Sequence, residues 1–88
     1  MKPQSVVRVA SSEFYQNDPV KAECPKCRLV FTLDSDRTLV LGSDLLVEMC
    51  PFCETSILVN MMGTDQVLIE AYPSMDAIQM RLRELGGA

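Results

Sequence analysis

Two copies of one pattern, CPKC at residues 24–27 and CPFC at residues 50–53, constrain the fold of this 88-residue chain more than any other feature. They hold all four cysteines, and the chain contains no histidine. A CxxC pair lets two thiolates reach one ion across a tight turn, while backbone N–H groups of that turn hydrogen-bond to the sulfurs. Proline fits the second position because it fixes φ and removes a donor that the turn does not need. The two pairs therefore predict one structural Zn²⁺ per chain, held by Cys24, Cys27, Cys50 and Cys53.

The spacing and the expected compartment support this prediction. Between Cys27 and Cys50 lie 22 residues, slightly more than the roughly 15–20 typical of paired CxxC zinc sites. No apolar run of signal-peptide length follows Lys2, and none approaches the ~20 residues of a membrane-spanning helix. We therefore expect a cytoplasmic protein without a membrane partner, in which thiols stay reduced and bind metal. Two structural disulfides are the alternative if the chain is exported.

Residues 20–60 resemble the zinc ribbons, a superfamily in which two CPxC turns at the ends of β-hairpins hold one zinc ion. The resemblance rests on CPKC, CPFC and the strand-like runs that follow each motif. It implies that the four cysteines are the ribbon ligands. Many ribbons have glycine directly after each motif, where this chain has Arg28 and Glu54. Because zinc ribbons serve many purposes, the resemblance implies a fold and a metal but no particular function.

Other uses of the thiols fit the sequence less well. Rubredoxins also use CPxC pairs to bind iron, but they are richer in aromatic residues than this chain, which has 6% aromatics and no tryptophan. A thioredoxin-like redox pair would begin a helix, whereas strand-like sequences follow both motifs here. Four thiolates leave no open position for zinc hydrolysis, and histidine, the commonest general base, is missing. We therefore expect that the protein is not an enzyme.

The rest of the sequence predicts a small β-rich α+β fold, with a zinc ribbon-like antiparallel sheet and a C-terminal amphipathic helix. Ser74 is a candidate N-cap, and Met75, Ile78, Leu82 and Leu85 recur at helical spacing before Gly86. The expected strands are residues 4–10, 20–23, 29–33, 37–41, 45–49, 55–60 and 66–72. The turn-prone residues 34–36 predict a hairpin between 29–33 and 37–41. We expect one domain, 1–88, with an N-terminal arm (1–19), the ribbon (20–60) and a strand plus helix (61–88).

The surface residues suggest a binding function. The net charge of −4 and the pI near 4.6 disfavour non-specific nucleic-acid binding. Phe52 is expected at the tip of the second motif, where it either packs back on Met49, Ile57 or the C-terminal helix, or meets a partner. We expect a zinc-stabilised protein-interaction module, a regulator, inhibitor or subunit of a larger complex, with Lys26, Arg28 and Phe52 as partner-binding residues. The second candidate is a nucleic-acid-binding ribbon that acts in transcription or translation through Lys21, Lys26 and Arg28, and the third is electron transfer.

Overall fold

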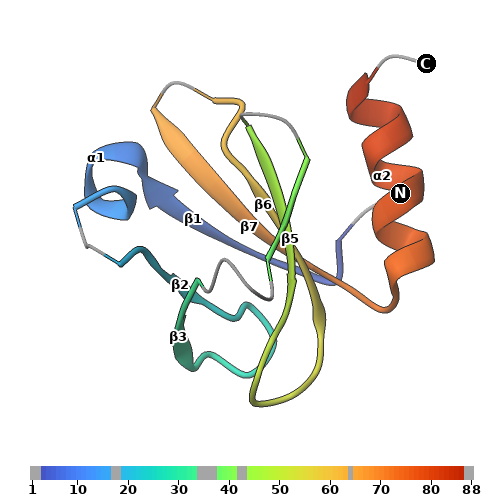
Figure 1. Ribbon diagram of the computed structural model, residues 1–88, viewed down its shortest axis with the longest axis horizontal. Helices are drawn as coiled ribbons and strands as arrows, with labels where there is room; N and C mark the ends of the chain where they lie inside the picture. The colour runs from blue at the N-terminus through green and yellow to red at the C-terminus, as the bar shows by residue number, and fades with distance from the viewer. Residues whose placement is uncertain (1–2, 17–18, 34–37, 42–43, 64, 87–88) are drawn as a thin grey trace.

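A five-stranded antiparallel sheet lies at the centre of the computed structural model, which describes residues 3–16, 19–33, 38–41, 44–63 and 65–86 (Figure 1). The sheet has the strand order β1-β7-β6-β5-β4, and β2 and β3 form a separate two-stranded hairpin. This arrangement, with its C-terminal helix, confirms the predicted α+β fold. In chain order the elements are β1 (Ser5–Ala10), α1 (Ser11–Phe14), β2 (Lys21–Glu23), β3 (Val30–Thr32), β4 (Leu39–Val40), β5 (Leu45–Met49), β6 (Ser56–Asn60), β7 (Gln66–Tyr72) and α2 (Met75–Gly86).

The central strands β6 and β7 are buried on both faces of the sheet. Every residue of β6 is buried, and its three central side chains alternate between two hydrophobic clusters. Ile57 and Val59 belong to the cluster that faces the β2–β3 hairpin, whereas Leu58 belongs to the cluster that faces α2. A strand covered on both sides favours consecutive apolar residues, which explains the run Ile57–Val59 at the centre of β6. The two edges of the sheet are β1 and β4.

The two faces of the sheet carry different elements, as Figure 1 shows with α2 on one side and the hairpin on the other. The face that the hairpin covers is packed with apolar side chains from several elements. They are Phe14 of α1, Ala22 of β2 and Phe31 of β3, together with Cys24 and Cys50. The candidate metal ligands therefore lie against the hydrophobic core.

Helix α2 begins where the sequence predicts. The N–H of Ala77 donates to the Ser74 hydroxyl oxygen at 3.3 Å, and Asp76 lies in the first turn, where a carboxylate is favourable. Ile78 is completely buried against the sheet, but Met75 is 41% exposed, so its predicted place on the buried face is wrong. Ala77 is buried instead, because its small side chain allows the start of the helix to approach the sheet closely.

A buried polar cluster also holds α2 against the sheet. The Tyr72 hydroxyl donates to the carboxylate of Glu70, and Arg81 Nε lies 3.5 Å from the same carboxylate. Glu70 is 2% exposed, and a carboxylate buried this deeply needs such partners. Burial raises the pKa of Tyr72, and the neighbouring Glu70 raises it further. Tyr72 therefore stays protonated and remains a hydrogen-bond donor.

The predicted hairpin between residues 29–33 and 37–41 is wrong. β3 pairs with β2, in the register Lys21 with Thr32, and β4 pairs with β5 in the other sheet. The CPKC turn connects β2 to β3 over only a few residues, so its closure costs little entropy. β4 extends the edge of the main sheet instead. The predicted turn at 34–36 lies outside the described residues. Within the part of the chain that the structure describes, no helix is long and apolar enough to cross a membrane.

Candidate metal centre

The first CPxC motif forms the turn of the β2–β3 hairpin, and we name residues 24–28 the first knuckle. The N–H of Arg28 donates to the carbonyl of Cys24 at 2.8 Å, and the N–H of Cys24 donates to the carbonyl of Leu29 at 2.9 Å. Backbone hydrogen bonds from Cys27 and Lys26 reach the Cys24 thiol. The turn therefore satisfies its own backbone groups and directs two further N–H groups at a sulfur, as metal-binding CxxC turns do.

The second CPxC motif forms the turn between β5 and β6, and we name residues 50–54 the second knuckle. Its hydrogen bonds match those of the first knuckle. The N–H of Glu54 donates to the carbonyl of Cys50 at 2.9 Å, and the N–H of Cys50 donates to the carbonyl of Thr55 at 2.9 Å. Backbone hydrogen bonds from Cys53 and Phe52 reach the Cys50 thiol. Each knuckle is thus the end of a β-hairpin, the arrangement that the resemblance to zinc ribbons implies.

The last residue of each knuckle, directly after its CPxC motif, has a left-handed backbone. Arg28 has φ 66° and Glu54 has φ 62°, and no other described non-glycine residue has a positive φ. Most side chains disfavour this conformation, which is why glycine commonly occupies it. The absence of glycine at these two positions therefore does not change the turn. Instead, Arg28 and Glu54 adopt this unfavourable φ, and the two backbone hydrogen bonds of each knuckle offset the strain.

The four cysteine sulfurs meet between the knuckles, which lie next to each other at the lower end of the view in Figure 1. All four Sγ atoms lie within 4.8 Å of one another, and the cysteines are free. Sγ of Cys24 lies 3.6 Å from that of Cys53, and Sγ of Cys27 lies 3.7 Å from that of Cys50. A tetrahedral set of thiolates with metal–sulfur bonds of about 2.3 Å has sulfurs about 3.8 Å apart. The donor set therefore fits one metal ion that connects the two knuckles.

Burial makes two of these thiols, Cys24 and Cys50, costly to ionise in the absence of a cation. Cys24 and Cys50 are completely buried, and Cys27 and Cys53 are half-buried. Burial raises the pKa of Cys24 to about 12, although the backbone hydrogen bonds oppose this effect. The pKa of Cys50 is raised for the same reason. Because a bound cation stabilises thiolates, a site of this kind gathers four negative charges only together with its metal.

Thr55 is a component of the site that the sequence did not reveal. Its side chain is buried, and its hydroxyl oxygen lies 3.0 Å from Sγ of Cys53. This hydrogen bond is the largest of the effects that lower the pKa of Cys53 to about 6. The corresponding residue of the first knuckle is Leu29, which is 50% exposed and has no hydroxyl. Only a comparison of the residues two positions after each motif could have indicated this difference.

The three predicted partner-binding residues are exposed, but they lie in different surroundings. Phe52 is 57% exposed, so it does not fold back into the core. Lys26 is exposed at the tip of the first knuckle. Arg28 is also exposed, and its Nε lies 3.3 Å from the carboxylate of Glu23. An exposed ion pair of this kind contributes about 0–1 kcal/mol to stability.

An apolar surface surrounds the exposed Phe52. Val30, Met49 and Phe52 are each more than half exposed, and Pro51 between them is exposed as well. We name these four residues the apolar tip. Beside it runs a groove of about 500 Å³, lined by Lys21, Val30, Phe31, Thr32, Pro51 and Phe52. The cation that lines this groove is Lys21, whereas Lys26 and Arg28 lie outside it.

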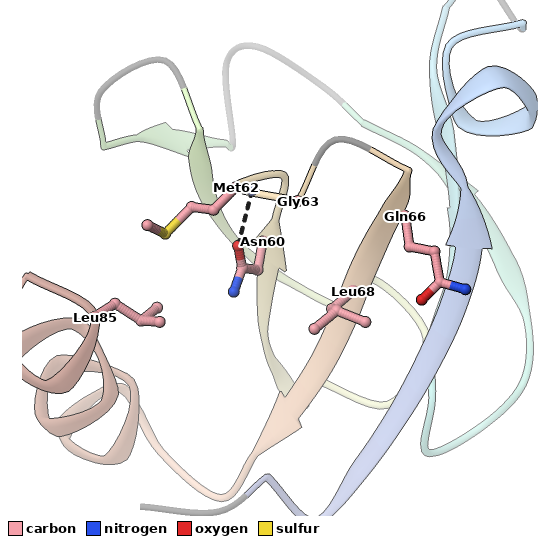
Figure 2. Close-up of a pocket in the computed structure, with 6 residues that line it drawn as sticks. All are labelled: Asn60, Met62, Gly63, Gln66, Leu68 and Leu85. Carbon is pink, nitrogen blue, oxygen red and sulfur yellow. Dashed lines mark hydrogen bonds between the residues drawn. The ribbon is translucent and has the colours of Figure 1, made fainter.

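A second cavity lies at the far end of β6 from the knuckles. Figure 2 shows it between the end of α2 and the turn that joins β6 to β7. It measures about 260 Å³, and Asn60 at its wall accepts a hydrogen bond from the N–H of Met62 at 3.0 Å. Its lining consists of Asn60, Met62, Gly63, Gln66, Leu68 and Leu85. None of these side chains titrates, so this cavity offers no acid or base for catalysis.

Comparisons with protein-family models, with curated proteins and with solved structures find no match to this chain. Its class therefore rests on the fold and the site alone. The chain is a small α+β domain with a four-cysteine group that can hold one metal ion.

Proposed function

We propose that this protein is a zinc-stabilised protein-interaction module that acts as a regulator, an inhibitor or a subunit of a larger complex. The observation that carries the proposal is the apolar tip. Phe52 is 57% exposed on a turn that two backbone hydrogen bonds hold in place and that offers two candidate metal ligands. A large aromatic side chain on such a rigid, exposed turn loses little entropy when a partner covers it.

The chemistry of the donor set supports zinc as the metal. Four thiolates and no other ligand type favour zinc or iron, and both accept tetrahedral geometry. The chain has few aromatic residues and no tryptophan, unlike the rubredoxins, which also use CPxC pairs. In this site zinc would act as a crosslink between the two knuckles. The low aromatic content therefore favours zinc over iron.

We propose further that the protein is not a catalyst and that it works in the cytoplasm. Four thiolates fill the coordination sphere, so the metal site has no position for a substrate or a water. The chain also has no histidine. A reducing compartment would keep the four free thiols able to bind metal. Together these features support binding rather than a reaction.

The test is to purify the tagged protein from its native cells and measure both its metal content and the proteins that remain bound. We expect one zinc per chain and a protein partner that is lost in Phe52→Ala. Met80→Ala is the matched control, because Met80 is 51% exposed on α2, away from the apolar tip. A partner that Phe52→Ala retains would contradict the role of the tip, and iron in place of zinc would favour electron transfer.

Nucleic acid is the second candidate partner. Lys21, Lys26 and Arg28 give the β2–β3 hairpin a concentration of cations, which is the observation in its favour. Bound nucleic acid in the purified protein, released by salt and by removal of these charges, would replace the proposed function with this one.

A further inference from the structure

The groove beside the apolar tip has two chemically different ends. Its exposed apolar lining comes from Pro51 and Phe52 of the second knuckle and Val30 of β3, which we take as its apolar end. Lys21 and Thr32 form its polar end, where they lie directly opposite each other in the β2–β3 pairing. Its volume of about 500 Å³ lies within the usual range of ligand sites, about 300–1,000 Å³. A ligand that fills the groove therefore needs both an apolar group and a polar group.

The strand sets the distance between these two groups. Val30 and Thr32 are exposed, while Phe31 between them is buried in the core. Residues two positions apart on a strand lie about 7 Å apart and point to the same side. An extended partner segment repeats its side chains at the same distance. Two side chains at positions i and i+2 of such a segment therefore match the two ends of the groove.

The charges of the hairpin indicate which polar group fits. Residues 20–33 contain three cations and one carboxylate, a formal charge of +2 in a chain of net charge −4. A zinc ion with four thiolates would have a charge of −2, which Lys26 and Arg28 next to Cys27 offset. Lys21 is two strand residues away from the knuckle and lines the groove, so its charge is available to an anion.

We propose that this groove binds an extended segment of a partner protein in which a large apolar residue and an Asp or Glu are two positions apart. The apolar side chain packs against Val30 and Phe52, and the carboxylate pairs with Lys21. This inference rests on the proposed function and adds the chemistry of the partner. A peptide fits better than a nucleic acid, because a phosphate backbone requires a row of cations and this groove has one cation beside an apolar wall.

A random 12-residue peptide library displayed on phage, selected on the zinc-loaded full chain, tests the proposal. Enriched peptides are then synthesised, and their binding is measured by fluorescence anisotropy. We expect them to share an apolar residue and a carboxylate at i and i+2. Phe52→Ala is expected to weaken binding about tenfold, and Lys21→Glu roughly fivefold. Exchange of the peptide carboxylate for lysine is expected to restore binding to Lys21→Glu.

Arg83→Glu serves as the matched charge reversal, since Arg83 is exposed on α2. It is expected to leave peptide affinity unchanged, and zinc content verifies the integrity of every variant. Peptides that bind through Phe52 but lack a carboxylate and ignore Lys21→Glu would overturn the inference and leave the proposed function standing. Binding of oligothymidine in place of peptides, self-association that buries Phe52, or no enriched peptide at all would overturn it as well. The proposed function itself is contradicted by different results from the purified protein: a protein partner that Phe52→Ala leaves bound, or bound nucleic acid in place of a protein.

Discussion

The two knuckles have the same backbone geometry but very different supports. Both use a CPxC turn, the same pair of hydrogen bonds and a residue with positive φ. The first knuckle ends a hairpin with three residue pairs, whose strands do not pair with those of the main sheet. The second ends a hairpin with five residue pairs, and its strand β6 pairs further with β7. The same CPxC turn therefore occurs once on a short hairpin and once on the central sheet.

This difference indicates what the metal does for the fold. The pairing of β6 with both β5 and β7 is expected to hold the second knuckle with or without an ion. The first hairpin packs on the sheet through Ala22 and Phe31, and its two metal ligands would add a crosslink to that contact. The metal is thus expected to stabilise the first hairpin far more than the sheet. The groove beside the apolar tip is lined by the first hairpin and by the second knuckle. Its shape would therefore depend on the metal as well.

Removal of the metal from the zinc-loaded protein should have the largest effect. With a chelator and a reductant, we expect hydrogen exchange to become at least ~100-fold faster in residues 21–33 and less than ~10-fold faster in β6 and β7. The reason is that the hairpin loses its crosslink while the sheet keeps its hydrogen bonds and its core. Hydrogen exchange with mass spectrometry measures both segments in one experiment. An equal increase along the whole chain would show that the metal stabilises the fold globally.

Substitutions of core residues in the main sheet and in the first hairpin should show which of the two stabilises the metal-free fold and which supports metal binding. Ile57 in β6 and Phe31 in β3 both belong to the cluster beside the cysteines, 0% and 5% exposed. Ile57→Ala should lower the free energy of unfolding by about 2–5 kcal/mol, with and without metal. Phe31→Ala should instead weaken metal binding and change the unfolding of the metal-free protein little. Urea denaturation of the metal-free and metal-loaded proteins measures these free energies of unfolding. An equal loss of stability for both variants in the metal-free protein would contradict the prediction.

Many features of the two knuckles and of the sheet could be predicted from the sequence, but only those that depend on short stretches of residues. Hydrophobic runs located the strands of the sheet, and Ser74 with the helical spacing located α2. The two motifs identified the cysteines that converge. The pairing of β3 could not be predicted, because a turn-prone segment at 34–36 and a metal-binding turn at 24–27 both offer a hairpin. Sequence alone does not rank these two pairings.

The finer features of the site depend on three-dimensional contacts. The exposure of Phe52 could not be predicted from the sequence, because Met49, Ile57 and the C-terminal helix each offered an apolar surface on which it could pack. The positive φ of Arg28 and Glu54 follows from the hydrogen bonds of each knuckle rather than from the residue type. Thr55 is one hydroxyl among several in the chain, and only its 3.0 Å distance to Cys53 identifies it.

Thr55 gives the second knuckle a hydroxyl hydrogen bond to a cysteine sulfur. The first knuckle has Leu29 at the corresponding position, and Thr55→Val should remove this difference. We expect zinc affinity to fall about tenfold, because a hydrogen bond to a ligating sulfur is lost. Thr55→Ser keeps the hydroxyl and should retain most of the affinity. Competition with a chromogenic chelator measures these affinities. Unchanged affinity in Thr55→Val would mean that the hydroxyl does not act on the metal site.

The same substitution should change the pH dependence of Cys53 in the metal-free, reduced protein. The Thr55 hydroxyl is the largest contributor that lowers the pKa of Cys53 to about 6, so this cysteine is mostly thiolate at pH 7. Without the hydroxyl its pKa rises, the thiolate fraction at pH 7 falls, and alkylation by iodoacetamide slows. The midpoint of the alkylation rate against pH should therefore move upward in Thr55→Val and stay in place in Thr55→Ser. An unmoved midpoint in Thr55→Val would contradict this origin of the low pKa.

The smallest effect should come from the feature that the two knuckles share. Glycine at position 28 or 54 relieves a backbone strain of about 1 kcal/mol or more, and its greater freedom in the unfolded chain offsets part of that gain. Glu54→Gly should therefore raise the midpoint of thermal unfolding of the zinc-loaded protein by about 2–5 °C. Arg28→Gly should raise it less, because it also removes the weak ion pair with Glu23. Differential scanning calorimetry resolves shifts of this size.

Alanine at the same two positions separates strain from charge. Arg28→Ala and Glu54→Ala remove the same side chains but keep a residue that disfavours positive φ, so neither should be stabilised. If alanine raised the midpoint as much as glycine, the gain would come from the lost charge rather than from the backbone. If glycine stabilised only position 54, the hairpin of the first knuckle would be flexible enough to relax its own strain. The two turns would then differ in rigidity as well as in support, and the partner would meet a fixed surface only on the side of the second knuckle.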